Sequence, residues 1–169
     1  STTFSELKGL KFAASGNRWA FFGRNHSGWN IIANDTIISF NASLVDEIQF
    51  SNTNDAISYS YIDAGQEKIV LDDRIIPTYS RHGKYFVSQK GKRFAYVSKR
   101  GNSYIMNING KESQIFDEIL PIGFKYNDEF LFAARNGNLW AIFQNETPIT
   151  ETYKNVSEAV INADGTSVG

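Results

Sequence analysis

Residues 90–119 read KGKRFAYVSKRGNSYIMNINGKESQIFDEI, and this stretch decides the fold. Short runs of strand-forming residues alternate with turn residues, and none of the runs has the 3.6-residue period of a helix. Glycine and asparagine suit the turns because both tolerate a positive φ. Asn109-Gly110, between two such runs, favours a type I′ hairpin. The stretch therefore predicts consecutive antiparallel strands.

The same pattern recurs along the whole chain. Its marker consists of three apolar residues. Two residues separate the first from the second, and one residue separates the second from the third. The five copies are Leu7/Leu10/Phe12, Val45/Ile48/Phe50, His82/Tyr85/Val87, Ile119/Ile122/Phe124 and Val156/Ala159/Ile161. Their first members are 38, 37, 37 and 37 residues apart, and the third copy is degenerate at His82. A fixed step of this length is typical of a repeat array.

Each repeat contains four strand-like runs. The second run steps from a bulky residue to a small one, at Trp19-Ala20, Ile57-Ser58, Phe94-Ala95 and Phe132-Ala133. The turns after it are expected at Arg24-Asn25, 63–65, 100–102 and 135–137. Two-residue hairpin turns are expected at Asn34-Asp35, Asp72-Asp73, Asn109-Gly110 and Asn145-Glu146. A small residue that recurs in the second strand predicts close packing there.

Four antiparallel strands in about 37 residues predict the blade of a β-propeller, and hence an all-β fold. The chain, 1–169, is predicted to be a single repeat region. Its units are 4–41, 42–78, 79–115 and 116–152, with a partial fifth unit at 153–169.

Residues 90–119 and NDEFLFAARNGNLWAIFQNETPI at 127–149 resemble the TolB-type WD40-like β-propeller repeat family. The resemblance implies a propeller architecture and a scaffold role, and it carries over no active site. The Gly-His and Trp-Asp dipeptides of strict WD40 repeats are absent. A competing interpretation is the tryptophan-glycine repeat, which 116–119 and 138–140 fit in part. Its defining Trp-Gly step is missing, because Ala141 follows Trp140.

The fifth copy of the marker is followed by only part of a unit, up to Gly169. We therefore expect the chain to form part of a larger or shared ring. An open array leaves apolar edges exposed, which native proteins avoid. A protein partner or a second copy of the chain is expected to complete the ring.

Composition excludes several classes of protein. With 41% hydrophobic residues and a net charge of −1, the chain is globular and is not a general polyanion binder, so nucleic acid is not expected as its partner. Zero cysteines exclude disulfides, thiol catalysis and thiolate metal sites. The absence of cysteine does not decide the compartment, because many extracytoplasmic bacterial proteins also lack it. An extracytoplasmic location is weakly favoured. No apolar run is long enough to span a membrane as a helix.

One stretch, 81–100, is locally basic. Its seven basic residues are Arg81, Lys84, Lys90, Lys92, Arg93, Lys99 and Arg100, and no acidic residue lies among them. Aromatic residues at 85, 86, 94 and 96 alternate with them, a mixture that anion-binding surfaces use. This pattern indicates a candidate surface for a partner or an anion, and the alternative is the solvated edge of a blade.

No catalytic, metal or cofactor residue is predicted. Gly165–Gly169 has the form G-x-S-x-G, but its repeat phase marks it as a turn. His26 and His82 are expected at the surface or in packing, Asp72-Asp73 in a solvated turn, and the three tryptophans in the core. The function that follows is a non-catalytic scaffold for protein–protein interaction. The alternative is the propeller domain of a hydrolase or glycan-acting enzyme whose catalytic part lies elsewhere.

Overall fold

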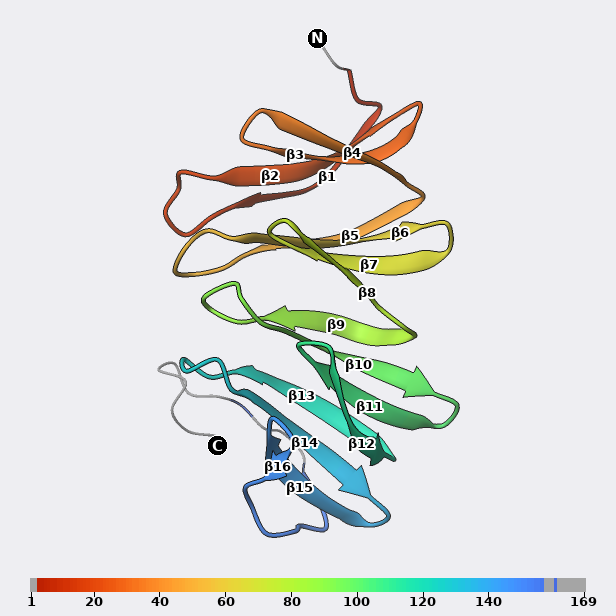
Figure 1. The fold of residues 1–169 in the computed structure, drawn as a ribbon, viewed down its shortest axis with the longest axis vertical. Coiled ribbons are helices and arrows are strands. Elements are labelled where there is room, and N and C mark those ends of the chain that lie inside the picture. The colour runs from red at the N-terminus through yellow and green to blue at the C-terminus, as the bar shows by residue number, and fades with distance from the viewer. Residues whose placement is uncertain (1–2, 157–159, 161–169) are drawn as a thin grey trace. The chain divides into compact units, whose positions relative to one another are not determined.

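The computed structural model describes residues 3–156 and 160, and all the regular elements in them are strands (Figure 1). Sixteen strands form four sheets of four antiparallel strands, and each sheet follows chain order without a crossover. The prediction of an all-β chain with four strands per repeat is confirmed. The arrangement of the sheets as a propeller stays a prediction.

The strands of the first sheet are β1 (Glu6–Phe12), β2 (Trp19–Asn25), β3 (Gly28–Ala33) and β4 (Thr36–Ala42). Those of the second are β5 (Leu44–Phe50), β6 (Ile57–Asp63), β7 (Gln66–Leu71) and β8 (Arg74–Pro77). Those of the third are β9 (Arg81–Val87), β10 (Phe94–Arg100), β11 (Ser103–Ile108) and β12 (Lys111–Phe116). Those of the fourth are β13 (Glu118–Phe124), β14 (Phe130–Asn136), β15 (Leu139–Gln144) and β16 (Thr147–Pro148).

The chain divides into two compact units, 1–79 and 80–169. Unit 1 holds the first and second sheets, and unit 2 holds the third and fourth. Residues 42 and 116, at which two of the sequence units begin, are the last residues of β4 and β12.

A β-bulge in the first strand of each sheet explains the spacing of the apolar marker. In a regular strand, residues three apart point to opposite faces. In β1 the register shifts between Lys8 and Lys11, so that two residues oppose one on β2. The shift returns Leu10 to the face of Leu7, and Phe12 follows on that face. β13 shifts at the same place, and β5 shifts one residue earlier.

The third sheet has a longer bulge. Arg81 pairs with Ser98, which takes the place that Gly23 has opposite Leu7 in the first sheet. His82 therefore lies one residue beyond the expected position of the marker, which accounts for the degenerate third copy.

The hairpin turns agree with the sequence. Asn109 and Gly110 have φ values of 54° and 87°, and Asn34 and Asp35 have 45° and 64°. Both central residues of each turn are thus left-handed, as a type I′ turn requires. The Asn34 side chain also accepts a hydrogen bond of 3.0 Å from the backbone of Trp19, which ties the turn to the start of β2.

Three local predictions were wrong. The turn expected at 135–137 lies at 137–138, because Arg135 and Asn136 stay paired with β15. Arg24 and Asn25 belong to β2 and do not form the turn, because both stay paired with β3; the turn lies at 26–27. The small residue of the fourth sheet was expected at Ala133, yet Leu131 holds the position of Ala20, opposite the end of the third strand. The loop before β14 spans 125–129, one residue shorter than the loop at 13–18, which accounts for one of the two residues of this difference.

Each unit buries its core between its two sheets. In unit 1 the first sheet contributes Ala20, Phe22, Trp29 and Ile31, and the second contributes Val45, Ile48, Ile57, Tyr59, Tyr61 and Val70. In unit 2 the third sheet contributes Ala95, Val97, Met106 and Ile108, and the fourth contributes Ile119, Phe130, Phe132, Ala134, Ala141 and Phe143. By register these are the same two faces, so one packing arrangement occurs twice.

Candidate interaction surface

The first sheet exposes the apolar face that its repeat partner buries. Leu7, Leu10 and Phe12 on β1 are 64%, 58% and 65% exposed. Their counterparts Val45 and Ile48 on β5 are 1% and 2% exposed, because the first sheet packs over them. We call the exposed surface the open face; it consists of Leu7, Leu10, Phe12, Trp19 and Phe21.

Aromatic rings extend the open face across β2. The rings of Trp19 and Phe21 stack at 5.8 Å with their planes 8° apart, and both side chains are half-buried. Together with β1 they line a shallow pocket of 380 Å³. The Phe4 ring packs over Gly23 on β2, where a Cβ would come within 2.7 Å of it. Trp19, expected in the core, thus lies at the surface, whereas Trp29 and Trp140 are buried as expected.

Paired loop contacts tie the two sheets of unit 1 together. Arg18, directly before β2, donates a hydrogen bond of 2.8 Å from Nη1 to the backbone oxygen of Asp55, directly before Ala56 and β6. The Ser15 hydroxyl donates to the carboxylate of the same Asp55. Asp55 has a φ of 53°, a turn conformation that leaves its carbonyl available to the neighbouring loop.

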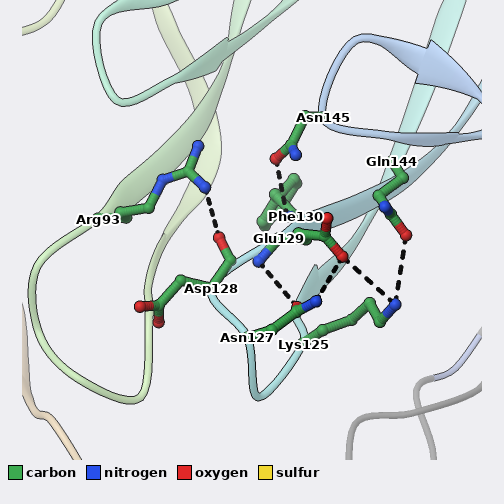
Figure 2. A network of polar contacts seen from close by, with 8 residues as sticks. All are labelled: Arg93, Lys125, Asn127, Asp128, Glu129, Phe130, Gln144 and Asn145. Atoms are coloured by element: carbon green, nitrogen blue, oxygen red, sulfur yellow. Dashed lines mark hydrogen bonds and ion pairs between the residues drawn. The ribbon is translucent and has the colours of Figure 1, made fainter.

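Unit 2 repeats this contact at equivalent positions (Figure 2). Arg93, directly before β10, donates from Nη1 to the backbone oxygen of Asp128 at 2.6 Å. Lys90 Nζ lies 3.8 Å from the Asp128 carboxylate, as Ser15 lies beside Asp55. A hydrogen bond to a charged donor is stronger than one between neutral groups. Arg18 and Arg93 thus act as clamps between neighbouring sheets.

The loop that receives the Arg93 clamp is fixed by further polar contacts (Figure 2). Asn127 donates to the Glu129 carboxylate at 2.6 Å, and Lys125 Nζ lies 3.5 Å from the same carboxylate. The Asn145 side chain accepts a 3.1 Å hydrogen bond from the backbone of Phe130. These contacts hold the turn at 127–128 against the first residue of β14.

The structure spreads the seven predicted basic residues over both ends of the third sheet. Lys90, Lys92 and Arg93 lie at the start of β10, and Lys99 and Arg100 lie at its end. Five strand residues, 94–98, lie between Arg93 and Lys99, which separates the two groups by about 20 Å. Arg81 pairs opposite the end of β10, and Lys84 lies exposed within the β9 bulge.

Most of these cations already contact groups of their own unit. Arg100 pairs with Glu112 at 2.9 Å, and Arg93 forms the clamp. Arg81 donates to the Gly83 oxygen at 2.7 Å, and Lys99 lies over the Tyr104 ring at 5.7 Å. A role of the seven as one surface for a partner or an anion stays a prediction.

The other candidate groups lie where turns and surfaces place them. His26 is exposed in the turn after β2, and the exposed His82 has its ring 5.4 Å from Tyr104. Asp72 and Asp73 are exposed in the turn between β7 and β8. Within the described part of the chain, no three His, Cys, Asp or Glu residues are grouped so as to hold a metal ion. The G-x-S-x-G sequence at 165–169 lies outside the described residues.

Sequence reasoning expected exposed apolar edges but did not place the open face, and it missed the clamps. One signal for the clamps was present, because Arg18 and Arg93 each directly precede the second strand of a repeat. The corresponding residues in the other two repeats are Ala56 and Glu129, so the signal occurs in alternate repeats only. The open face carried no signal, because its apolar marker is the same as the one that is buried in the second sheet.

Burial changes the acid–base properties of one core residue. Tyr59 is 4% exposed, and burial raises the pKa of its phenol to about 12, with a smaller contribution from Tyr61 beside it. Nearby, the hydrogen bond from Lys68 Nζ to the Asp63 carboxylate raises the pKa of Lys68.

No protein-family model matches this chain, and no curated protein is significantly similar to it. Among the residues that the structure describes, there is no apolar helix of the length that a membrane span needs. The function is therefore argued from the geometry of the chain alone.

Proposed function

We propose that this chain is a non-catalytic β-propeller-type scaffold that binds a protein through the open face of its first sheet. The observation that carries the proposal is the contrast between Leu10, 58% exposed, and its repeat counterpart Ile48, 2% exposed. Contiguous exposed apolar residues mark interaction sites in soluble proteins. Stacked aromatic rings at Trp19 and Phe21 add the residue types that interfaces favour.

The partner that suits this face is another four-stranded sheet of the same repeat. Both units support this choice, because in each of them an apolar sheet face covers the face that is equivalent to the open one. A second copy of the chain supplies such sheets. In this proposal the four sheets are blades of a ring that the chain shares with its copy.

The mass of the particle in solution tests the proposal. By light scattering, the chain is expected to form a species of at least twice 19.0 kDa that dissociates on dilution. Leu10→Asp places a carboxylate on the open face and is expected to return the mass to 19.0 kDa. Ile75→Asp is the matched control, since Ile75 is 60% exposed on β8, away from that face. A mass of 19.0 kDa for the unmodified chain at every concentration contradicts the proposal.

A further inference from the structure

A pocket in unit 2 lies where the equivalent sheet of unit 1 places a lysine. In the second sheet, Lys68 on β7 pairs opposite Tyr61 on β6. In the fourth sheet the same register position is Ala141, opposite Ala134. Beside these two alanines the structure has a pocket of 480 Å³, within the range of small-molecule sites.

The lysine in unit 1 shows what this place accommodates. Its Nζ lies 5.8 Å from the centre of the Tyr61 ring and donates a 2.6 Å hydrogen bond to Asp63. The side chain is only 24% exposed, so its methylene stem lies against the sheet. An aromatic ring and a carboxylate thus hold an alkylammonium group at this position.

The pocket in unit 2 has an aromatic wall, an apolar floor and a carboxylate, and it lacks the lysine. The register position of Asp63 is Asn136 here, so the carboxylate comes from a different place, the turn after β15. Phe116 and Phe143 form an aromatic wall, with ring centres 5.1 Å apart, and both are nearly buried. Ala134 and Ala141 form the floor, at 2% and 9% exposed. The carboxylate belongs to Glu146 at the rim.

Further substitutions separate the two places. Position 42 in unit 1 is alanine, whereas its counterpart 116 is phenylalanine, and Tyr61 is replaced by Ala134. The Phe116 ring therefore takes over the aromatic role of Tyr61 from a neighbouring strand. The lysine has no such replacement, so the space of its stem stays open.

The charge of the lining selects a cation. Glu146 is the one ionisable side chain among the pocket residues, and the others are apolar, amide or hydroxyl groups. Lys111 Nζ lies 2.7 Å from Glu146, but its side chain is 73% exposed and reaches the carboxylate from outside the lining. An exposed ion pair of this kind contributes little, so an incoming ammonium can share or displace it.

From these observations we infer that the pocket between β12, β14 and β15 binds an alkylammonium group, the chemistry shared by a lysine side chain and a free amine. The alkyl chain lies on Ala141 against the rings of Phe116 and Phe143, and the ammonium faces Glu146. This site is separate from the open face, and its test does not depend on the proposed scaffold function.

A titration with n-butylammonium, followed by the NMR shifts of the Ala134 and Ala141 methyl groups, tests the inference. A saturable shift with a dissociation constant of about 1 mM is expected for so small a ligand. The neutral analogue 1-butanol is expected to bind at least tenfold more weakly. N-acetyl-lysine-methylamide distinguishes the sources: tighter binding than butylammonium assigns the pocket to a protein lysine, and equal or weaker binding to a free amine.

Three variants complete the test. Ala141→Lys restores the side chain of unit 1 and is expected to abolish binding, and Glu146→Gln is expected to weaken it at least tenfold while leaving the pocket in place. Leu10→Asp, on the open face, is the control that leaves binding unchanged even where it dissociates the particle. The inference is overturned by the absence of a saturable shift, by equal binding of 1-butanol, or by unchanged binding in both pocket variants.

Discussion

β1 and β5 share one sequence pattern and one bulged backbone, but they differ in what covers them. Leu10 on β1 is 58% exposed, whereas Ile48 on β5 is 2% exposed beneath the first sheet. The pattern therefore specifies which face of a strand is apolar. Whether that face is buried depends on the next sheet along, which a single repeat does not contain.

Truncation of the covered residue is expected to have the largest effect. Ile48→Ala removes buried methyl groups and leaves a cavity, which lowers the free energy of unfolding by about 3 kcal/mol. Urea denaturation at low protein concentration measures it. An effect below about 1 kcal/mol contradicts the packing of the first sheet on the second.

Tyr59, on the covered face, predicts that the stability of the fold falls at alkaline pH. The pKa of Tyr59 is about 12 in the folded chain and 10.0 in its ordinary state, so between these values the folded state holds the proton more tightly. Its contribution is complete below pH 10 and is lost as the pH rises to 12, by about 2 kcal/mol. Between pH 10 and 12, the free energy of unfolding, measured by urea denaturation, is expected to fall more in the unmodified chain than in Tyr59→Phe. If the free energy of unfolding depends on pH equally in the two proteins, the raised pKa of Tyr59 is ruled out.

The clamps between neighbouring sheets come next. Arg18→Ala and Arg93→Ala each remove a charged donor from a loop carbonyl and are expected to lower the free energy of unfolding by about 1 kcal/mol. Arg24→Ala is the control, because Arg24 is 53% exposed and pairs within its own sheet; its effect is expected to stay below about 0.5 kcal/mol. If all three variants lose the same amount, the clamps have no special role.

The open face is expected to tolerate truncation when the chain is dilute. Leu10→Ala removes methyl groups that are already in water, so the free energy of unfolding changes by less than about 0.5 kcal/mol. Urea denaturation, compared with Ile48→Ala under the same conditions, gives the contrast directly. Losses of similar size in the two variants mean that β1 is covered within the single chain.

The local fold was predictable from the sequence because each step depends on neighbouring residues. Asn109-Gly110 requires a left-handed turn, and the repeat phase places the same turn at Asn34-Asp35. The length of a bulge or a loop does not follow from such local rules. For that reason the sequence did not predict that Leu131 holds the position of the small residue. It also did not predict the extra residue before Tyr85.

The candidate surfaces were predictable only in part. The basic residues at 81–100 were read as a neighbourhood because they are close in sequence, but β10 separates Arg93 from Arg100 by its full length. The open face, the clamps and the pocket beside Ala141 depend on which sheet lies against which. Only the three-dimensional pairing of the repeats supplies that information.

The most direct test measures whether the open face is covered when the protein assembles. The chain has no cysteine, so Leu10→Cys and Ile75→Cys each introduce a single thiol at sites of matched exposure, 58% and 60%. The rate of maleimide labelling is followed as the protein concentration rises. If copies associate through the open face, labelling of Leu10→Cys slows as the concentration rises, while labelling of Ile75→Cys stays constant. A constant rate for Leu10→Cys at every concentration contradicts this association.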